Sequence, residues 1–240
     1  GIRAIVFLKG CPMKCFWCQN PESINPQPEV AFRPKRCISC NICQEVCPEG
    51  AIIPIEEGRI DRGKCSLCLK CAEACPTTAL LRIGEWMSVK EVLKKIKSYS
   101  AFFEASDDGG VTLSGGDPLY QWEFSYELIK AFQKNHIHVA IETAGYANYD
   151  IFKKIVDNID LLLYDLKHMD SQQHKAGTGV PNEIILSNLK RITTEKKNLH
   201  CVIRIPLVPG FNDDEENVLK TAKFVKSLGI KQIDLLPFNE

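Results

Sequence analysis

The twelve cysteines of this 240-residue chain are clustered, because eleven of them precede residue 76. Three lie in one short loop, at Cys11, Cys15 and Cys18, and eight more fill a segment that ends at Cys75. Disulfide scaffolds are usually short and secreted, whereas 165 residues with a single further cysteine follow Cys75 here. We therefore expect most of these cysteines to be metal ligands in a reducing compartment.

Composition and charge narrow the class of protein. The chain is 45% hydrophobic and 25% charged, which is typical of a globular domain and excludes a disordered one. The 30 basic residues match the 30 acidic ones, so a nucleic-acid partner bound through bulk positive charge is not expected. No apolar run of about 18 residues and no signal peptide is present, which predicts a cytoplasmic protein with no membrane partner.

Outside the cysteine-rich segment, strands and helices alternate. Residues 2–8 form a β-branched, apolar run typical of a buried strand, and because Gly1 is not Met we expect the natural start upstream. Ser88 and Glu91 form a capping box before a helix to about residue 99. Further strands are predicted at 111–113, 138–142, 161–166, 199–205 and 231–236, and further helices at 121–135, 149–157, 182–195 and 213–228.

This alternation predicts an α/β fold with a parallel sheet and helices outside it. About six units would form a partial (β/α)6 barrel, and the alternative is an open doubly wound sheet. Polar or glycine-rich segments follow the strands at 11–18, 114–117, 142–143 and 165–167, with Arg204 and Asn239 in corresponding places. In a barrel these strand ends share one face, where active sites are built.

The segment 29–82 is expected to be a separate small α+β domain inserted into the barrel of residues 1–28 and 83–240. It holds two copies of Cys-x-x-Cys-x-x-Cys-x-x-x-Cys-Pro, offset by 28 residues, which is the spacing of bacterial two-cluster ferredoxins. In that spacing the fourth cysteine of each copy ligates the other cluster. Two auxiliary 4Fe-4S clusters are therefore predicted, one on Cys37, Cys40, Cys43 and Cys75 and the other on Cys65, Cys68, Cys71 and Cys47. Zinc sites would leave the two Cys-Pro endings unexplained.

The loop Cys11-Pro-Met-Lys-Cys15-Phe-Trp-Cys18 provides three thiolates for a cluster with four irons. One iron would then be open to a substrate, as in catalytic metal sites generally. The alternative is a zinc ion completed by a distant histidine, but the five histidines show no paired ligand spacing.

This loop at the end of a first strand resembles that of the radical S-adenosylmethionine (SAM) superfamily. More narrowly, the chain resembles the activating enzymes of glycyl radical enzymes, in segments spread over nearly its whole length: Gly1-Ile2-Arg3, Lys9-Gly10-Cys11-Pro12, Trp17-Cys18-Gln19-Asn20-Pro21-Glu22, residues 109–116, Asp165-Leu166-Lys167 and Val208-Pro209-Gly210-Phe211. In that family both ends normally extend further.

The resemblance implies a third 4Fe-4S cluster, on Cys11, Cys15 and Cys18, whose open iron chelates SAM. Reductive cleavage of SAM then yields a 5′-deoxyadenosyl radical that abstracts hydrogen from a backbone glycine of a partner enzyme. The residues that it implies for SAM binding are Trp17, Cys18, Gln19, Gly115, Gly116, Asp117, Glu142, Thr143, Asp165, Leu166, Lys167, Arg204 and Asn239. Lys167 suits the SAM carboxylate, Leu166 would contribute backbone, and the two glycines would let backbone approach the methionine moiety. Asp117 replaces the usual Glu, and Asn239 a common His.

The resemblance also implies partners. The inserted domain indicates the subgroup that activates dehydratases, decarboxylases and C–N or C–S lyases, since the activating enzyme of pyruvate formate-lyase lacks it. The insert would relay electrons from a low-potential donor such as flavodoxin or ferredoxin, or it would dock a partner or be structural. Two alternatives remain open: a radical SAM enzyme acting on a small molecule or another peptide, and a ferredoxin-type electron carrier.

Overall fold

The computed structural model describes residues 1–238, so the predicted SAM residue Asn239 lies outside the described part. The chain forms two compact units. One contains Gly1–Ile24 and the chain from Met87 onward, and the other is Asn25–Trp86. The predicted limits of the insert, 29 and 82, fall a few residues inside the second unit.

The larger unit is built on one six-stranded parallel sheet in the order β1-β4-β5-β6-β7-β8. The strands are β1 (Arg3–Leu8), β4 (Gly110–Gly115), β5 (His138–Thr143), β6 (Leu161–Asp165), β7 (Cys201–Leu207) and β8 (Gln232–Pro237). In a doubly wound sheet the strand order reverses at a switch point. Here each strand lies beside the previous one of the sheet, and β1 and β8 do not pair within residues 1–238. The order is therefore that of an incomplete barrel, and the doubly wound alternative was wrong.

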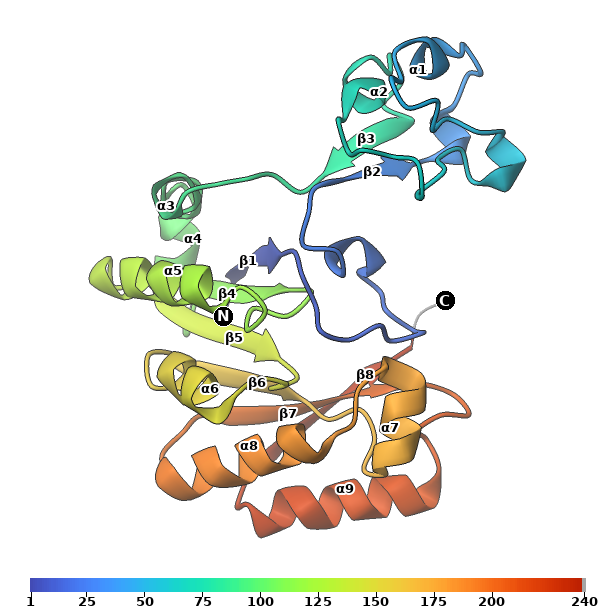
Figure 1. Ribbon diagram of the computed structural model, residues 1–240. Helices are drawn as coiled ribbons and strands as arrows, with labels where there is room; N and C mark the ends of the chain where they lie inside the picture. Colours follow the sequence, from blue (N-terminus) through green and yellow to red (C-terminus); the bar gives the residue numbers. More distant parts are fainter. Residues whose placement is uncertain (239–240) are drawn as a thin grey trace. The chain divides into compact units, whose positions relative to one another are not determined.

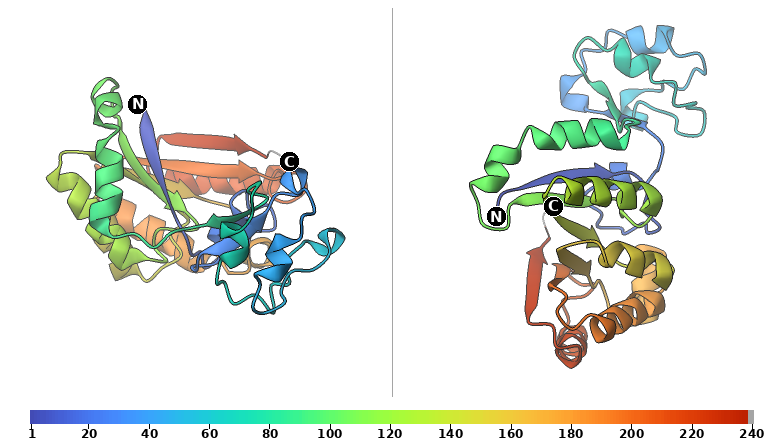
Figure 2. Two further views of the ribbon diagram at one scale, coloured as in Figure 1. Left: turned by 90° about the horizontal axis from the view of Figure 1, so that it is seen from above. Right: turned by 90° about the vertical axis from the view of Figure 1, so that its left-hand side faces the viewer.

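Helices cover one face of this curved sheet (Figure 1; Figure 2). They are α3 (Val89–Lys97), α4 (Ser100–Glu104), α5 (Trp122–Lys134), α6 (Tyr149–Val156), α7 (Ser171–Thr178), α8 (Glu183–Glu195) and α9 (Glu215–Ser227). Their apolar sides and alternate strand residues form one core, in which Leu113, Phe132, Ile141 and Phe152 are fully buried. None of the helices described in residues 1–238 is long and apolar enough to cross a membrane.

The predicted elements are confirmed to within two residues at most boundaries, but two short helices were not predicted. The capping box is present, because Glu91 N donates to Ser88 Oγ at 3.3 Å and Ser88 N donates to Glu91 Oε2 at 2.8 Å. The unpredicted helices are α4 and α7. Asp170 caps α7 by accepting a hydrogen bond from Gln173 N at 2.9 Å.

The smaller unit repeats one backbone pattern twice. Its antiparallel strands β2 (Glu29–Phe32) and β3 (Leu80–Ile83) pair Phe32 with Leu80, and an isolated bridge pairs Ile52 with Ile60, each 28 residues from its counterpart. The single-turn helices α1 (Ile42–Glu45) and α2 (Lys70–Glu73) share the same offset. The conformations ahead of them also match, with positive φ at Ser39, Asn41, Leu67 and Leu69.

Candidate active site

The predicted catalytic residues gather in one cavity of the larger unit, with a volume of about 190 Å³. The strand register explains this, because Leu8 pairs with Gly115, Thr143 with Tyr164, and Asp165 with Arg204. The carboxyl ends of the strands thus meet at one edge. Among the residues lining the cavity are Cys11, Cys15, Trp17, Cys18, Gln19, Gly115, Gly116, Asp117, Glu142, Thr143, Asp165, Lys167 and Arg204.

The cysteine loop is held by backbone hydrogen bonds from both of its sides. Gly10 N donates to Ser23 O at 2.7 Å, and the last turn of α7 accepts from Lys14 N at 2.8 Å through Thr178 O. Phe16 N donates to Gly177 O at 3.1 Å. The loop is therefore positioned by helix α7, which follows the Asp165–Lys167 motif in the chain.

Three thiols of this loop face one cavity, and no fourth cysteine is among the described residues that line it. Burial raises the pKa of Cys11 to about 12 and also raises the pKa of Cys15. Such thiols stay protonated until a metal displaces the proton. The donor set fits a 4Fe-4S cluster with one iron left without a protein ligand.

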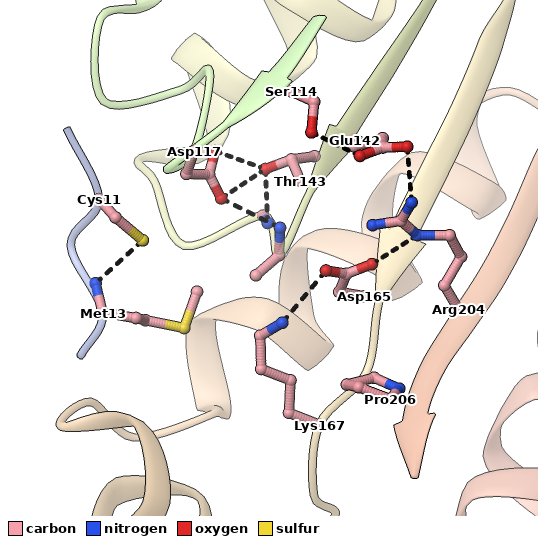
Figure 3. Close-up of polar contacts among 12 residues, drawn as sticks. Cys11, Met13, Ser114, Asp117, Glu142, Thr143, Asp165, Lys167, Arg204 and Pro206 are labelled. Atoms are coloured by element: carbon pink, nitrogen blue, oxygen red, sulfur yellow. Dashed lines mark hydrogen bonds and ion pairs between the residues drawn. The ribbon is translucent and has the colours of Figure 1, made fainter. Parts of the chain in front are cut away.

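A continuous network of charged side chains forms the opposite wall (Figure 3). Arg204 Nη1 lies 2.7 Å from Glu142 Oε1, and Arg204 Nε donates to Asp165 Oδ1 at 2.8 Å. Lys167 Nζ donates to Asp165 Oδ2 at 3.1 Å, and Ser114 Oγ donates to Glu142 Oε2 at 2.5 Å. Two carboxylates and two cations thus balance in charge within the wall.

The ionisation of this network follows from its pairing. Burial by itself would raise the pKa of Asp165, but Lys167 and Arg204 outweigh burial and hold that pKa below its ordinary value. Burial would likewise lower the pKa of Lys167, yet Asp165 raises it. Lys167 is therefore an ammonium ion at neutral pH, with N–H donors beyond the one that Asp165 accepts.

Asp117 binds the neighbouring strand end. Its carboxylate accepts hydrogen bonds from Thr143 Oγ1 at 2.8 Å, Ala144 N at 3.0 Å and Leu119 N at 3.0 Å. The side chain is 3% exposed, and burial raises its pKa. Asp117 thus joins the end of β4 to the end of β5 while lining the cavity.

The two glycines after β4 have a reason within the chain to lack side chains. A Cβ at Gly115, whose φ is +120°, would lie 2.1 Å from Leu8 O, and one at Gly116 would lie 2.3 Å from Gly10 O. Both glycines bring the end of β4 against the backbone that leads into the cysteine loop. Close packing of backbone therefore requires them, independently of any ligand.

Some predicted and observed residues differ. Leu166 is not among the residues that line the cavity, because its side chain lies in the hydrophobic core and its N–H donates to Arg204 O at 3.0 Å. The sequence analysis missed residues that do line it: Met13, Asn20, Ser114, Ala144, Pro206, Leu207, Val208, Leu236, Pro237 and Phe238. Ser114 and Val208 lie inside segments already singled out, so their position in those motifs was the available signal.

The smaller unit contains two hollows, each lined by four cysteines. One is lined by Cys37, Cys40, Cys43 and Cys75, and the other by Cys47, Cys65, Cys68 and Cys71. Each hollow combines three cysteines of one repeat with the fourth of the other. The last cysteine of each repeat accepts a backbone hydrogen bond, from Ala51 N to Cys47 Sγ at 3.3 Å and from Leu80 N to Cys75 Sγ at 3.4 Å. Four thiols around one hollow fit a 4Fe-4S cluster.

Comparison with known families agrees with the cavity. Residues 5–222 match the family described as the radical SAM superfamily. The chain belongs to this superfamily. The three-cysteine loop, β1 and most of the charged wall all lie within the matched residues.

Individual relatives are similar over most of their length. The chain is 45% identical to the (2S)-3-sulfopropanediol sulfolyase activating enzyme of Bilophila wadsworthia, over 91% of this chain and 74% of that protein. It is 42% identical to the trans-4-hydroxy-L-proline dehydratase activating enzyme of Clostridioides difficile, over 100% of this chain and 80% of that protein. A crystal structure of a domain of the pyruvate-formate lyase-activating enzyme from Bacteroides vulgatus has a TM-score of 0.51 and 40% identity, over 55% of this chain and 82% of that domain. Each of these radical SAM relatives is named an activating enzyme.

Proposed function

We propose that this radical SAM protein activates a glycyl radical enzyme, with SAM bound in the cavity beside the three-cysteine loop. The observation that carries the proposal is the shared lining of that cavity. Three thiols and a charged wall face the same space, so a cluster-bound ligand with a carboxylate would meet Lys167. The named activities of the relatives support the same function.

The residues of this chain have separate tasks in the proposed reaction. Cys11, Cys15 and Cys18 hold a 4Fe-4S cluster, and Lys167 binds the carboxylate of SAM. When bound, the cluster supplies the electron that cleaves SAM to a 5′-deoxyadenosyl radical, which abstracts hydrogen from the glycine of the partner. Asp165 and Arg204 hold the Lys167 ammonium in place. The protein binds and orients the reactants and need not supply an acid or base.

We also propose that the smaller unit carries two auxiliary 4Fe-4S clusters and relays electrons from a low-potential donor of the flavodoxin or ferredoxin type. The two hollows with four cysteines each support this proposal. Reconstitution should then give about 12 iron atoms per chain. Oxygen-labile clusters of this kind require an anaerobic cytoplasm. Full activity after long exposure to air would contradict that expectation.

The partner enzyme is proposed as a class only. The relatives are named for a sulfolyase and a dehydratase, which belong to the expected range of dehydratases, decarboxylases and C–N or C–S lyases. A panel of such enzymes, each incubated anaerobically with the reduced protein and SAM, should include one that acquires a glycyl radical signal by electron paramagnetic resonance.

The first test is the anaerobic cleavage of SAM by the reconstituted, reduced protein, measured as 5′-deoxyadenosine. Cys15→Ala should abolish the product. Cys201→Ala is the matched control, because Cys201 is buried in β7 and does not line the cavity. Product from Cys15→Ala at the wild-type rate would refute the assignment of the loop. Redox activity without SAM cleavage in fully loaded protein would favour an electron carrier.

A further inference from the structure

Arg59, in the smaller unit, is a buried cation with no acidic partner. The residue is 4% exposed, and no carboxylate pairs with it within residues 1–238. Its Nη2 donates to Asn41 Oδ1 at 3.0 Å and to Cys43 Sγ at 3.1 Å. Its Nε is buried and has no hydrogen-bond partner.

Such an arrangement is costly for a folded protein. Buried charges are normally paired, and buried N–H groups normally find an acceptor. The backbone adds strain, because Arg59 has a φ of +68°, a conformation that a non-glycine residue rarely adopts. An anion and a hydrogen-bond acceptor beside Arg59 would remove the first two penalties.

The space beside Arg59 is one of the two cysteine-lined hollows. Arg59 lines the hollow of Cys37, Cys40, Cys43 and Cys75, and it already donates to the sulfur of Cys43. A 4Fe-4S cluster on four thiolates is an anion whose sulfur atoms accept hydrogen bonds. The unpartnered Nε and the unpaired charge thus match the group proposed for this hollow.

The other hollow provides an internal comparison, because the two halves of the unit share one backbone pattern with a 28-residue offset. The position equivalent to Arg59 is Ala31, and the position equivalent to Asn41 is Leu69. Both the cation and its hydrogen-bond acceptor are therefore replaced by apolar residues in the second half. No cationic side chain lines the hollow of Cys47, Cys65, Cys68 and Cys71.

We propose that Arg59 tunes the reduction potential of the cluster on Cys37, Cys40, Cys43 and Cys75, by donating hydrogen bonds to its sulfur atoms and by placing a positive charge beside it. This inference rests on the proposed auxiliary clusters. One-electron reduction adds a negative charge to a cluster, and hydrogen bonds to sulfur and local charge set its potential. The cluster beside Arg59 therefore has the higher potential of the auxiliary pair. The two halves are unequal in redox function although their cysteine spacing is identical.

The test is a redox titration of the fully reconstituted chain with solution mediators, monitored by electron paramagnetic resonance. In Arg59→Met, one auxiliary midpoint potential should become more negative by at least tenfold in the equilibrium constant for reduction, which is about 59 mV for a one-electron couple. The other midpoint should not move. Arg59→Lys keeps the charge but not Nε, so it should shift by less. Arg62→Met is the matched control, because Arg62 is exposed and does not line either hollow.

A second measurement does not depend on the folding of a variant. In the wild-type chain labelled with ¹⁵N-arginine, pulsed electron paramagnetic resonance of the reduced auxiliary clusters should show a ¹⁵N coupling. Absence of the coupling, or unchanged midpoints in an Arg59→Met protein with full iron content, would overturn the inference. If instead wild-type protein binds only about four irons, the auxiliary clusters themselves are refuted. Iron analysis thus separates the two failures.

Discussion

Replacing Lys167 with Met should weaken SAM binding without unfolding the site. The Lys167 side chain is 11% exposed, and its Nζ spends one donor on Asp165 Oδ2 at 3.1 Å. An ammonium has three donors, so two are free for a ligand carboxylate in the cavity. Met has a similar length but neither charge nor donors. Asp165 keeps its hydrogen bond from Arg204 at 2.8 Å and so retains a cationic partner.

The expected size follows from the lost contact. A hydrogen bond to a charged group contributes about 1.5–3 kcal/mol. At about 1.4 kcal/mol per factor of ten, the Kd for SAM should rise by about 10- to 150-fold. The lower end applies if Arg204 turns from its carboxylates to the ligand, and the upper end if the network stays as it is.

The assay is anaerobic equilibrium binding of SAM to reconstituted protein with equal iron content. Lys175→Met, on the exposed side of α7, is the matched control and should bind like the wild type. Decarboxylated SAM tests the chemistry directly, because it lacks the group that Lys167 is proposed to bind. It should bind equally to wild type and Lys167→Met. A Kd for SAM within twofold of the wild type in Lys167→Met would refute the role given to this lysine.

Two further predictions concern packing in the barrel. Gly177→Ala places a Cβ 2.5 Å from the Phe211 ring and 2.9 Å from Trp17, so urea denaturation should show a loss of about 1–3 kcal/mol. Adding Phe211→Leu should recover part of that loss, and no recovery would contradict the clash. Burial raises the pKa of Cys201 from 9.0 to about 12, so the folded chain holds a proton that the unfolded chain releases. Stability should therefore fall as the pH rises above 9, and less steeply in Cys201→Ala. Equal slopes in the two proteins would show that Cys201 does not contribute.

The sequence predicted the barrel well where local pattern and burial agree. The β-branched runs of β1, β5 and β6 are buried strands, and amphipathic segments such as α5 and α9 are helices. The sequential order of strands could not be read from the pattern alone, because pairing of β1 with β4 joins residues more than 100 positions apart. The site residues were predictable since parallel strand ends share an edge.

Helix α7 shows where this reasoning failed. Its residues are mostly polar, so no apolar periodicity predicted it. Its buried residues are His174, Gly177 and Thr178, and Thr178 Oγ1 donates to His174 O at 2.8 Å. Its contact with the cysteine loop is made by backbone carbonyls, which leave no mark in the side-chain pattern.

Arg59 and Asp117 illustrate a second limit. Each is an ordinary charged residue in a loop, and burial distinguishes it only after folding. Asp117 was expected to influence the amino group of SAM. Three of its observed contacts are instead hydrogen bonds from Thr143, Ala144 and Leu119. Comparison of the two halves of the insert could have singled out Arg59, because Ala31 occupies the equivalent position.

The pairing of β1 with β4 has a consequence for how such proteins change over evolutionary time. Leu8 and Gly110 belong to neighbouring strands, so everything between them is a single excursion from the sheet. Doubling the length of a flexible excursion costs only about 0.6 kcal/mol in closure entropy. A lineage can therefore acquire or discard the whole cysteine-rich unit at this one point without altering a strand register elsewhere in the barrel.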